Sequence, residues 1–423
     1  ELSLNDDLNQ ELLAKAQFRL KFEELFFVQL RLISQNLQRK QKIKGMPFEA
    51  VGEKFTEFFE NHLPFELTNA QKRVIKEIRN DLGSNAQMNR LLQGDVGSGK
   101  TIVALMCMLL AIDNGFQTCL MAPTEILATQ HYNGLKELLE NMDVKIALLT
   151  GSTKKSERTL IHNQLENGNL NILVGTHAVL EDKVQFKNLG LAIVDEQHRF
   201  GVEQRKALID KGYSPEVLAL TATPIPRTLA FTIHGDMHLS IIDELPKNRI
   251  PIITKVVEPS RIDKVYDFMK KEMNACRQCF VIYPIIEESE KMDWKASDTG
   301  YEKLSETIFK DYKVGYIHGK MNKEARDEQM AAMANNEVQC LVSTTVVEVG
   351  IDIPNATIMV IENAERFGLT QLHQLRGRIG RGTQQSYCIL VKHKDTPEAE
   401  HRLKVMESTS NGFKISDEDL KLR

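Results

Sequence analysis

The chain has 423 residues, of which 42% are hydrophobic and 26% charged, a composition that supports a buried core and excludes a disordered or fibrous protein. Its length favours two or three domains over one, at roughly 150 residues per domain. The 54 basic and 58 acidic residues give a net charge of −4, which excludes an overall basic field, so any binding of nucleic acid must use local groups. The apolar run 102–112 is too short to span a bilayer and predicts a buried helix.

Residues 1–60 are predicted to form a helical lead-in segment, because leucines, phenylalanines and charges recur at helical spacing between Leu12 and Leu37. A short basic run follows at 39–44, and such runs are usually solvated rather than bound to nucleic acid. The chain opens on Glu1 and not on Met, so we expect it to be part of a longer protein.

From about residue 90, short apolar segments alternate with longer amphipathic ones. This alternation predicts parallel strands covered by helices, and therefore an α/β fold with two sheets. The first series of predicted strands is 90–93, 119–122, 146–149, 172–175, 191–194 and 217–221, and the second is 253–257, 280–283, 314–317, 339–343, 357–361 and 387–391. The segment 243–251 holds two prolines and is the expected joint. We therefore expect one domain at 61–245, a second at 246–395 and a tail at 396–423.

A phosphate-binding loop is predicted at 94–101, where GDVGSGKT fits G-x-x-x-x-G-K-[ST] in full between a predicted strand and a long helix. Glycines let backbone N–H groups surround the phosphates, the lysine reaches the outer phosphates, and the hydroxyl can ligate Mg²⁺. The predicted ATP contacts in this loop are Gly94, Gly97, Ser98, Gly99, Lys100 and Thr101.

Two adjacent acids, Asp195 and Glu196, follow the apolar segment 191–194. Acids at the end of a buried strand, in a chain that carries a phosphate loop, are suited to metal and water chemistry. We expect Asp195 to hold Mg²⁺ through water, together with Thr101, and Glu196 to orient or deprotonate the attacking water.

These motifs resemble those of superfamily 2 helicases. The phosphate loop, the DEQH string at 195–198 and the TAT string at 221–223 are similar to the first three conserved motifs, 342–354 resembles motif V, and QLRGRIGR at 374–381 resembles motif VI. The strings DEQHRFGVEQR and LTATPIPRTLA narrow the resemblance to the RecG branch of bacterial DNA helicases. The similarity runs from about Leu12 to the end of the chain.

The resemblance implies two tandem RecA-like domains and further site residues. Phe65 and Gln71 would read adenine, since a side-chain amide can pair with its N6 and N7. Arg378 and Arg381 would be arginine fingers that complete the site only when the two domains close on ATP. The residues expected to couple nucleotide state to DNA are His198, Thr221, Thr223, Gly350, Asp352 and Gln374.

DNA contacts, on this interpretation, go mostly to phosphates. Small residues at strand ends can grip phosphate oxygens without a basic patch, although Ser and Thr at such places are as often helix caps. The predicted contacts are Thr124, Gly175, Thr176 and Thr345.

The tail begins with a good helix start at Thr396 and Pro397, has a turn at Asn411 and Gly412, and is predicted to open a second helix at Ser416. In the RecG branch this region resembles a translocation motif, here expected to be cut short. Nothing in 1–60 looks like the wedge domain that engages branched DNA, so we expect a motor without its fork-reading part.

The expected function is an ATP-dependent DNA helicase or translocase of recombination and repair, with ATP and Mg²⁺ as cofactors, branched or duplex DNA as partner and no membrane. A monomeric motor is expected. A cytoplasmic location is expected as well, since most of the six cysteines sit inside apolar runs, as thiols do in a reducing compartment. Three alternatives stay open: the motor of a transcription-repair coupling translocase, an RNA helicase, for which D-E-A-D would replace D-E-Q-H, and a nucleotide switch that does not hydrolyse ATP.

Overall fold

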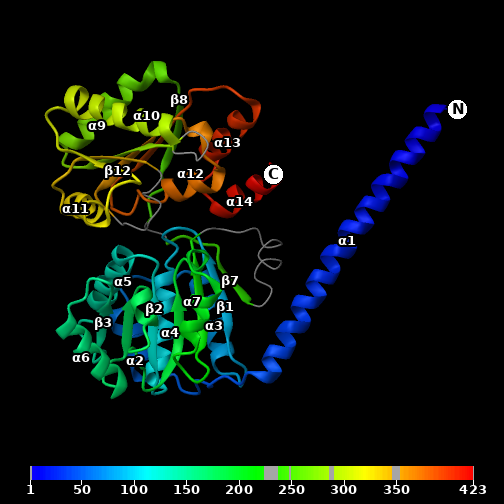
Figure 1. Cartoon of the computed structure of the whole chain (residues 1–423), viewed down its shortest axis with the longest axis vertical. Coiled ribbons are helices and arrows are strands. Elements are labelled where there is room, and N and C mark those ends of the chain that lie inside the picture. Colours follow the sequence, from blue (N-terminus) through cyan, green and yellow to red (C-terminus); the bar gives the residue numbers. More distant parts are fainter. Residues whose placement is uncertain (1, 223–236, 247–248, 285–289, 345–352, 423) are drawn as a thin grey trace.

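The computed structural model describes residues 2–222, 237–246, 249–284, 290–344 and 353–422. Two lobes, each a parallel sheet with helices on its faces, lie one above the other, and a long N-terminal helix projects away from them (Figure 1). Both sheets confirm the predicted α/β class and two-lobe arrangement. The domain boundaries at 245 and 395 stay predictions.

The first sheet has seven described strands in the order β3-β4-β2-β5-β6-β1-β7. They are β1 (Asn89–Gly94), β2 (Gln117–Met121), β3 (Ile146–Leu149), β4 (Ile172–Gly175), β5 (Leu189–Val194), β6 (Glu216–Thr221) and β7 (His238–Ile242). Six of these match the predicted segments within two residues at each end, and β7 is missing from the prediction. Strand β7 is an edge strand whose His238 and Ser240 bond to Asp81 and Glu77, so it lacks the continuous apolar run of a central parallel strand.

Helices of the first lobe follow the predicted pattern. They are α2 (Glu53–Glu57), α3 (Asn69–Leu82), α4 (Lys100–Asp113), α5 (Glu125–Leu138), α6 (Lys155–Glu166) and α7 (Val202–Ile209). Helix α4 is buried at every position from Ile102 to Ile112, which confirms that this apolar run is a core helix. A buried helix directly after β1 gives the phosphate loop two rigid anchors.

The second sheet has six described strands in the order β10-β11-β9-β12-β13-β8. They are β8 (Ile253–Val257), β9 (Gln278–Tyr283), β10 (Val314–Ile317), β11 (Cys340–Thr344), β12 (Ala356–Ile361) and β13 (Tyr387–Val391), and the helices are α9 (Ile262–Asn274), α10 (Glu290–Lys303), α11 (Lys323–Ala334) and α12 (Leu369–Arg376). All six strands agree with the predicted segments within two residues at each end.

The lead-in segment is helical in part. Helix α1 (Leu2–Lys42) projects from the first lobe (Figure 1), whereas 43–52 holds no helix. The chain after α1 is fastened to the first lobe by the buried Glu216, whose carboxylate accepts hydrogen bonds from the backbone N–H groups of Met46 and Met88. Among the described residues, no helix is both long and apolar enough to cross a membrane.

The tail forms two helices, α13 (Pro397–Ser408) and α14 (Gly412–Lys421). The predicted start of α13 is confirmed, since the Thr396 hydroxyl accepts a hydrogen bond from Ala399 N. The prediction of a second helix starting at Ser416 is wrong: α14 begins at Gly412, because the Asn411 side chain caps the N–H groups of Phe413 and Lys414. What looked like a turn before the helix is its N-terminal cap.

The cysteines give a direct test of the packing. Cys276 is exposed and the other five are buried; burial raises the pKa of Cys107, Cys119, Cys340 and Cys388 to about 12 and that of Cys279 well above its usual value. Because the thiolate is the reactive form, we expect one thiol per native chain to react rapidly with an aromatic disulfide reagent. After denaturation all six should react, and rapid reaction of several thiols in the native chain would contradict this packing.

Candidate nucleotide site between the two lobes

The phosphate loop connects β1 to α4, as predicted, and two of its glycines require their special backbone. Gly97 and Gly99 have φ values of 75° and 85°, in the region that side chains disfavour. A Cβ at Gly99 would also lie 2.2 Å from Gln71 Nε2. Lys100 Nζ donates hydrogen bonds to the carbonyl oxygens of Gly94 and Asp95, at 2.8 and 2.9 Å.

Gln71, on α3, is hydrogen-bonded to this loop. It is fully buried; its Oε1 accepts a hydrogen bond from Thr68 N at 2.8 Å, and its Nε2 donates to the carbonyl of Ser98 at 2.9 Å. Both ends of the amide are thus engaged within the protein, so the structure places Gln71 as a brace between α3 and the loop. Its predicted reading of adenine stays a prediction that would require these bonds to rearrange.

A pocket of about 650 Å³ is lined by residues that precede and follow Gln71 in the chain, although not by Gln71 itself. It is lined by Phe65, Thr68, Asn69 and Lys72 from the first lobe and by Glu244, Leu245 and Pro246 from the joint. An aromatic ring and apolar side chains suit a flat base. The predicted site residue Phe65 therefore lines a cavity of fitting chemistry.

The two acids lie at the carboxyl end of β5. Asp195 Oδ2 accepts a hydrogen bond from His131 Nε2 at 2.7 Å, and its Oδ1 accepts from Glu196 N at 3.0 Å. Burial alone would raise the pKa of Asp195, but His131 and the charge of Lys100 lower it overall. The carboxylate is therefore charged and held in one orientation, as a metal ligand requires. His131, from α5, was not predicted, because no motif spacing relates it to the acids.

Glu196 combines an unusual backbone with an available carboxylate. Its φ and ψ are 48° and 53°, a left-handed conformation that non-glycine residues adopt at a cost and that often marks functional sites. Burial and the neighbouring Asp195 raise the pKa of its carboxyl. Its Oε2 is buried and has no hydrogen-bond partner among the described residues, and His198 Nδ1 lies 3.6 Å from it. A carboxylate with a free oxygen suits the positioning of a water molecule.

The second lobe repeats this turn with one acid in place of two, since Glu362 stands where Asp195 stands. The string IENAERFG at 361–368 follows β12 as VDEQHRFG at 194–201 follows β5, and Asn363, with φ and ψ both at 47°, stands where Glu196 stands. Gln371 Oε1 accepts from Gly368 N as Gln204 Oε1 accepts from Gly201 N. Since the second lobe has an amide in place of this acid, the acid pair at this turn belongs to the first lobe.

Two arginines of the second lobe lie close enough to the acid pair and the loop to act on them electrostatically. The charge of Arg378 acts on the Glu196 carboxylate, and the charge of Arg381 acts on Lys100. Burial lowers the pKa of Lys100, while the carboxylates of Glu196 and Asp195 oppose that shift. The two lobes approach closely here, because a Cβ at Gly377 would lie 2.9 Å from Val96 Cβ.

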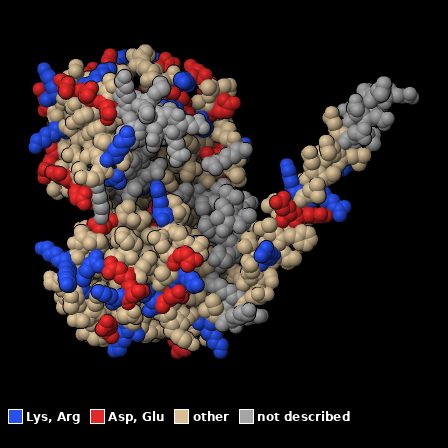
Figure 2. Space-filling view, in the orientation of Figure 1, with Lys and Arg blue, Asp and Glu red and all other residues tan. Residues whose placement is uncertain are grey.

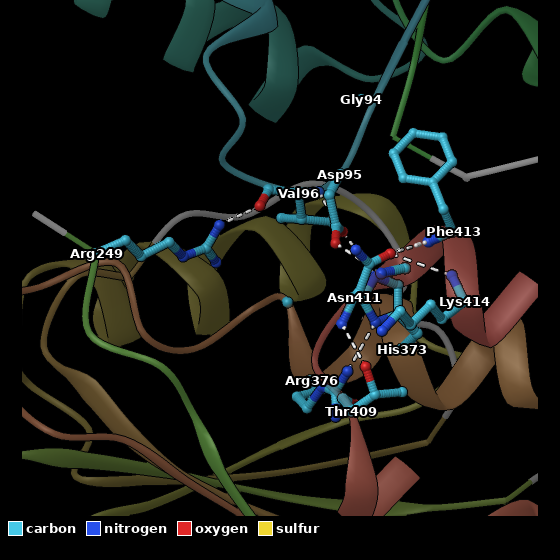
Figure 3. A network of polar contacts seen from close by, with 12 residues as sticks. Gly94, Asp95, Val96, Arg249, His373, Arg376, Thr409, Asn411, Phe413 and Lys414 are labelled. Carbon is cyan, nitrogen blue, oxygen red and sulfur yellow. Dashed lines mark hydrogen bonds and ion pairs between the residues drawn. The ribbon is translucent and has the colours of Figure 1, made fainter. Parts of the chain in front are cut away.

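Asp95 joins the loop to the second lobe in a network that motif reasoning missed (Figure 3). Its Oδ1 accepts a hydrogen bond from His373 Nε2 at 2.6 Å, and its Oδ2 accepts from Gly412 N at 3.1 Å. Burial would raise the pKa of Asp95, but His373 and the backbone donors lower it overall. Arg249, from the joint, donates to the carbonyl of Val96. The phosphate-loop pattern accepts any residue at position 95, so it carries no signal for these contacts.

The predicted coupling residues are only partly described. His198 lies beside Glu196, Thr221 is buried at the end of β6, and Gln374 is on α12 close to His373. Thr223, Gly350 and Asp352 lie outside the described residues. Their roles stay predictions.

Three of the four predicted DNA contacts, Thr124, Gly175 and Thr176, lie at or just past strand ends of the first lobe. Thr124 caps α5, since its hydroxyl accepts from Leu127 N. Gly175 ends β4, where a Cβ would lie 2.3 Å from the carbonyl of Leu149. Thr176 is buried, and its hydroxyl has no hydrogen-bond partner among the described residues. Thr345 lies outside the described part of the chain.

The charged side chains on one face of the molecule do not form a large patch of one sign. On the face that Figure 2 shows, Lys and Arg are interspersed with Asp and Glu over both lobes. This agrees with the net charge of −4. Attraction for DNA from this face would therefore depend on local contacts.

Family models match both lobes. Residues 68–232 match the DEAD/DEAH box helicase family, and residues 260–383 match the helicase conserved C-terminal domain. Among solved structures, one of RecG bound to a three-way DNA junction aligns with a TM-score of 0.85 and 46% identity, over 97% of this chain and 54% of that one. The DUF1998 helicase MrfA bound to DNA and AMPPNP aligns with a TM-score of 0.62 and 18% identity, over 90% of this chain and 57% of that one, which shows a shared fold.

Curated relatives cover nearly the whole chain. The ATP-dependent DNA helicase RecG of Synechocystis sp. is 49% identical over 98% of this chain and 50% of its own length, and that of Bacillus subtilis is 48% identical over 98% of this chain and 61% of its own length. The chain thus spans between half and about three fifths of these relatives. Together with the matching lobes and loop, this similarity shows that the chain belongs to the RecG family of helicases.

Proposed function

We propose that this chain is an ATP-driven DNA motor that acts on branched or duplex DNA in recombination and repair. The observation that carries the proposal is the close approach of segment 377–381 of the second lobe to the phosphate loop. A Cβ at Gly377 would lie 2.9 Å from Val96 Cβ, and the charges of Arg378 and Arg381 act on Glu196 and Lys100. Relatives named ATP-dependent DNA helicase, and one bound to a three-way DNA junction, support DNA as the partner.

In the proposed reaction each lobe supplies one part. The loop N–H groups and Lys100 would hold the ATP phosphates, while Glu196 would orient the water that attacks the outer phosphate. Arg378 and Arg381 would stabilise the charge that develops in the transition state. Since these arginines come from the second lobe, hydrolysis would depend on how the lobes close.

Mg²⁺ fits the donor set of the first lobe. The hydroxyl of Thr101 would ligate it, and the carboxylate of Asp195, oriented by His131, would hold it through water. The ion would supply positive charge to neutralise the phosphate oxygens. Both are oxygen donors, which magnesium prefers. ATP and Mg²⁺ are therefore the proposed cofactors.

DNA would contact residues at or just past the strand ends of both lobes. Thr124, Gly175, Thr176 and Thr345 are the proposed phosphate contacts, and closure on ATP would tighten them while hydrolysis would loosen them. A monomeric motor in the cytoplasm is part of the same proposal. Five buried free thiols fit a reducing compartment.

Replacing Lys100 by alanine tests the proposal. Removal of the ammonium that holds the outer phosphates is expected to lower DNA-stimulated ATP hydrolysis at least about 100-fold, measured as phosphate release with and without a DNA junction. Lys145→Ala, at an exposed position away from the loop, is the matched control and should keep the turnover of the unchanged chain. Equal turnover in the two variants would refute the assignment.

A further inference from the structure

The pattern of a phosphate loop gives the Asp95 carboxylate no role in holding phosphates. A phosphate loop uses the backbone at this position, and its pattern accepts any side chain there. Asp95 is nevertheless only 9% exposed, and a buried carboxylate is unfavourable unless it is hydrogen-bonded. A carboxylate would repel phosphates bound in this loop. The hydrogen-bond partners of Asp95 therefore indicate why an acid stands at this position.

Those partners come from three parts of the chain (Figure 3). Oδ1 accepts hydrogen bonds from Val96 N, at 2.7 Å, and from His373 Nε2, at 2.6 Å. Oδ2 accepts from Gly412 N, at 3.1 Å, which is 317 residues further along the chain. One side chain thus ties the phosphate loop to α12 and to the first residue of α14.

The contact with His373 continues into the tail. Arg376 donates to His373 Nδ1 at 3.0 Å, and because a guanidinium only donates, Nδ1 is the acceptor and Nε2 carries the proton given to Asp95. The same guanidinium donates to the carbonyls of Met406 and Thr409, at 2.8 and 3.0 Å. A closed ring of polar contacts therefore runs from the loop through α12 to the α13–α14 turn and back to Asp95.

The start of α14 is built to receive this carboxylate. Asn411 Oδ1 accepts from Phe413 N and Lys414 N, at 2.9 and 3.1 Å, so the first helical N–H, on Gly412, is the one directed at Asp95. A carboxylate at a helix N-terminus is favoured by the helix dipole. The bond to Gly412 is thus charge-assisted and holds the helix to the loop.

The backbone of Asp95 meets the group that must move when phosphates arrive. Lys100 Nζ donates to the carbonyls of Asp95 and Gly94, at 2.9 and 2.8 Å. A bound phosphate would draw the ammonium away and would also draw the loop N–H groups toward itself. Nucleotide would therefore act on the main chain of the residue whose side chain holds the tail.

We propose that Asp95 is a positioning residue that transmits nucleotide occupancy of the phosphate loop to the α13–α14 turn at 409–412. The inference rests on the proposed function, since it takes ATP to occupy the loop. It adds a direct path from the loop to the tail, which does not depend on DNA or on hydrolysis.

Hydrogen exchange of the tail amides tests this path. Exchange at 409–416 is measured with and without AMPPNP and Mg²⁺, each variant being saturated according to its own binding titration. In the unchanged chain, nucleotide is expected to change the exchange rate of the Gly412–Ile415 amides severalfold. In Asp95→Asn these amides should exchange about tenfold faster without nucleotide, because a charge-assisted bond is lost, and the response to AMPPNP should disappear.

Two variants separate transmission from mere packing. Gly412→Pro removes the N–H that Asp95 accepts, at the first helical position, where proline is favoured, and the extended backbone of Asn411, with ψ at 111°, suits a residue before proline. It should keep α14 and lose the nucleotide response. Asp113→Asn is the matched control, since Asp113 accepts in the same way from Lys54 N and Phe55 N at α2, and it should keep the response of the tail.

The outcomes distinguish this inference from the proposed function. A nucleotide response that persists in Asp95→Asn and in Gly412→Pro, with AMPPNP bound, overturns the inference alone. Failure of the unchanged chain to bind AMPPNP overturns the proposed function and the inference with it. A response lost in both variants and kept in Asp113→Asn supports the path through Asp95.

Discussion

Replacing Glu196 by glutamine is expected to lower DNA-stimulated ATP turnover by about 10² to 10⁴, the range typical for removal of a general base. The amide keeps the size of the side chain but cannot take a proton or hold the water in the same way. ATP should still bind, because the loop and Lys100 are intact. Phosphate release at saturating ATP, combined with a binding titration of AMPPNP, measures the two effects separately.

The control for this change is Glu203→Gln. Glu203 is exposed on α7, a short distance along the chain from the acid pair. Glu203→Gln therefore removes the same charge at a position outside the site. Its turnover should stay close to that of the unchanged chain. If Glu196→Gln turned over ATP as fast as Glu203→Gln, hydrolysis at this site would not use Glu196.

Replacing Arg381 by alanine should lower turnover by about 10³ to 10⁵, the size of effect that an arginine finger has on phosphoryl transfer. Arg381 acts electrostatically on Lys100 from the second lobe, so its removal takes positive charge away from the developing phosphate charge. Arg378→Ala should also lower turnover, because the charge of Arg378 acts on the Glu196 carboxylate. Single-turnover hydrolysis under saturating nucleotide gives the measurement.

Arg381→Lys extends the test. Lysine keeps the charge but lacks the planar fork of donors, so it should recover only part of the lost rate. Arg261→Ala, at an exposed position of the same lobe, controls for loss of positive charge. A turnover equal to that of Arg261→Ala would show that Arg381 has no part in hydrolysis.

Most strands of the fold could be predicted from the sequence because they are buried. Twelve predicted strands agree with the structure, since parallel strands covered on both faces appear as short apolar runs between helical segments. Strand β7 was not predicted, because this edge strand has the polar residues His238 and Ser240 in place of a continuous apolar run. The start of α14 was placed too late because Asn411 and Gly412 are typical both of turns and of helix caps.

The site residues also fall into those that local spacing predicts and those that depend on tertiary packing. Lys100, Asp195 and Glu196 could be predicted because their chemistry imposes a spacing within one strand–loop unit, and that spacing is local. His131 could not, because its contact with Asp195 spans 64 residues and depends on how α5 packs beside β5. Gln71 was assigned to adenine by its motif, whereas its burial and its bond to Ser98 became visible only in the fold.

The sequence by itself determined the two-lobe α/β class, the phosphate loop, the acid pair and the identity of the arginines that could face them. Each of these follows from residue type and local spacing, which backbone hydrogen bonding and burial impose. Only the tertiary structure decided that Asp95 bonds to His373 and Gly412, 278 and 317 residues away. Contacts of that kind arise from the packing of one lobe on the other, and no local pattern encodes them, because the phosphate loop tolerates any residue at that position.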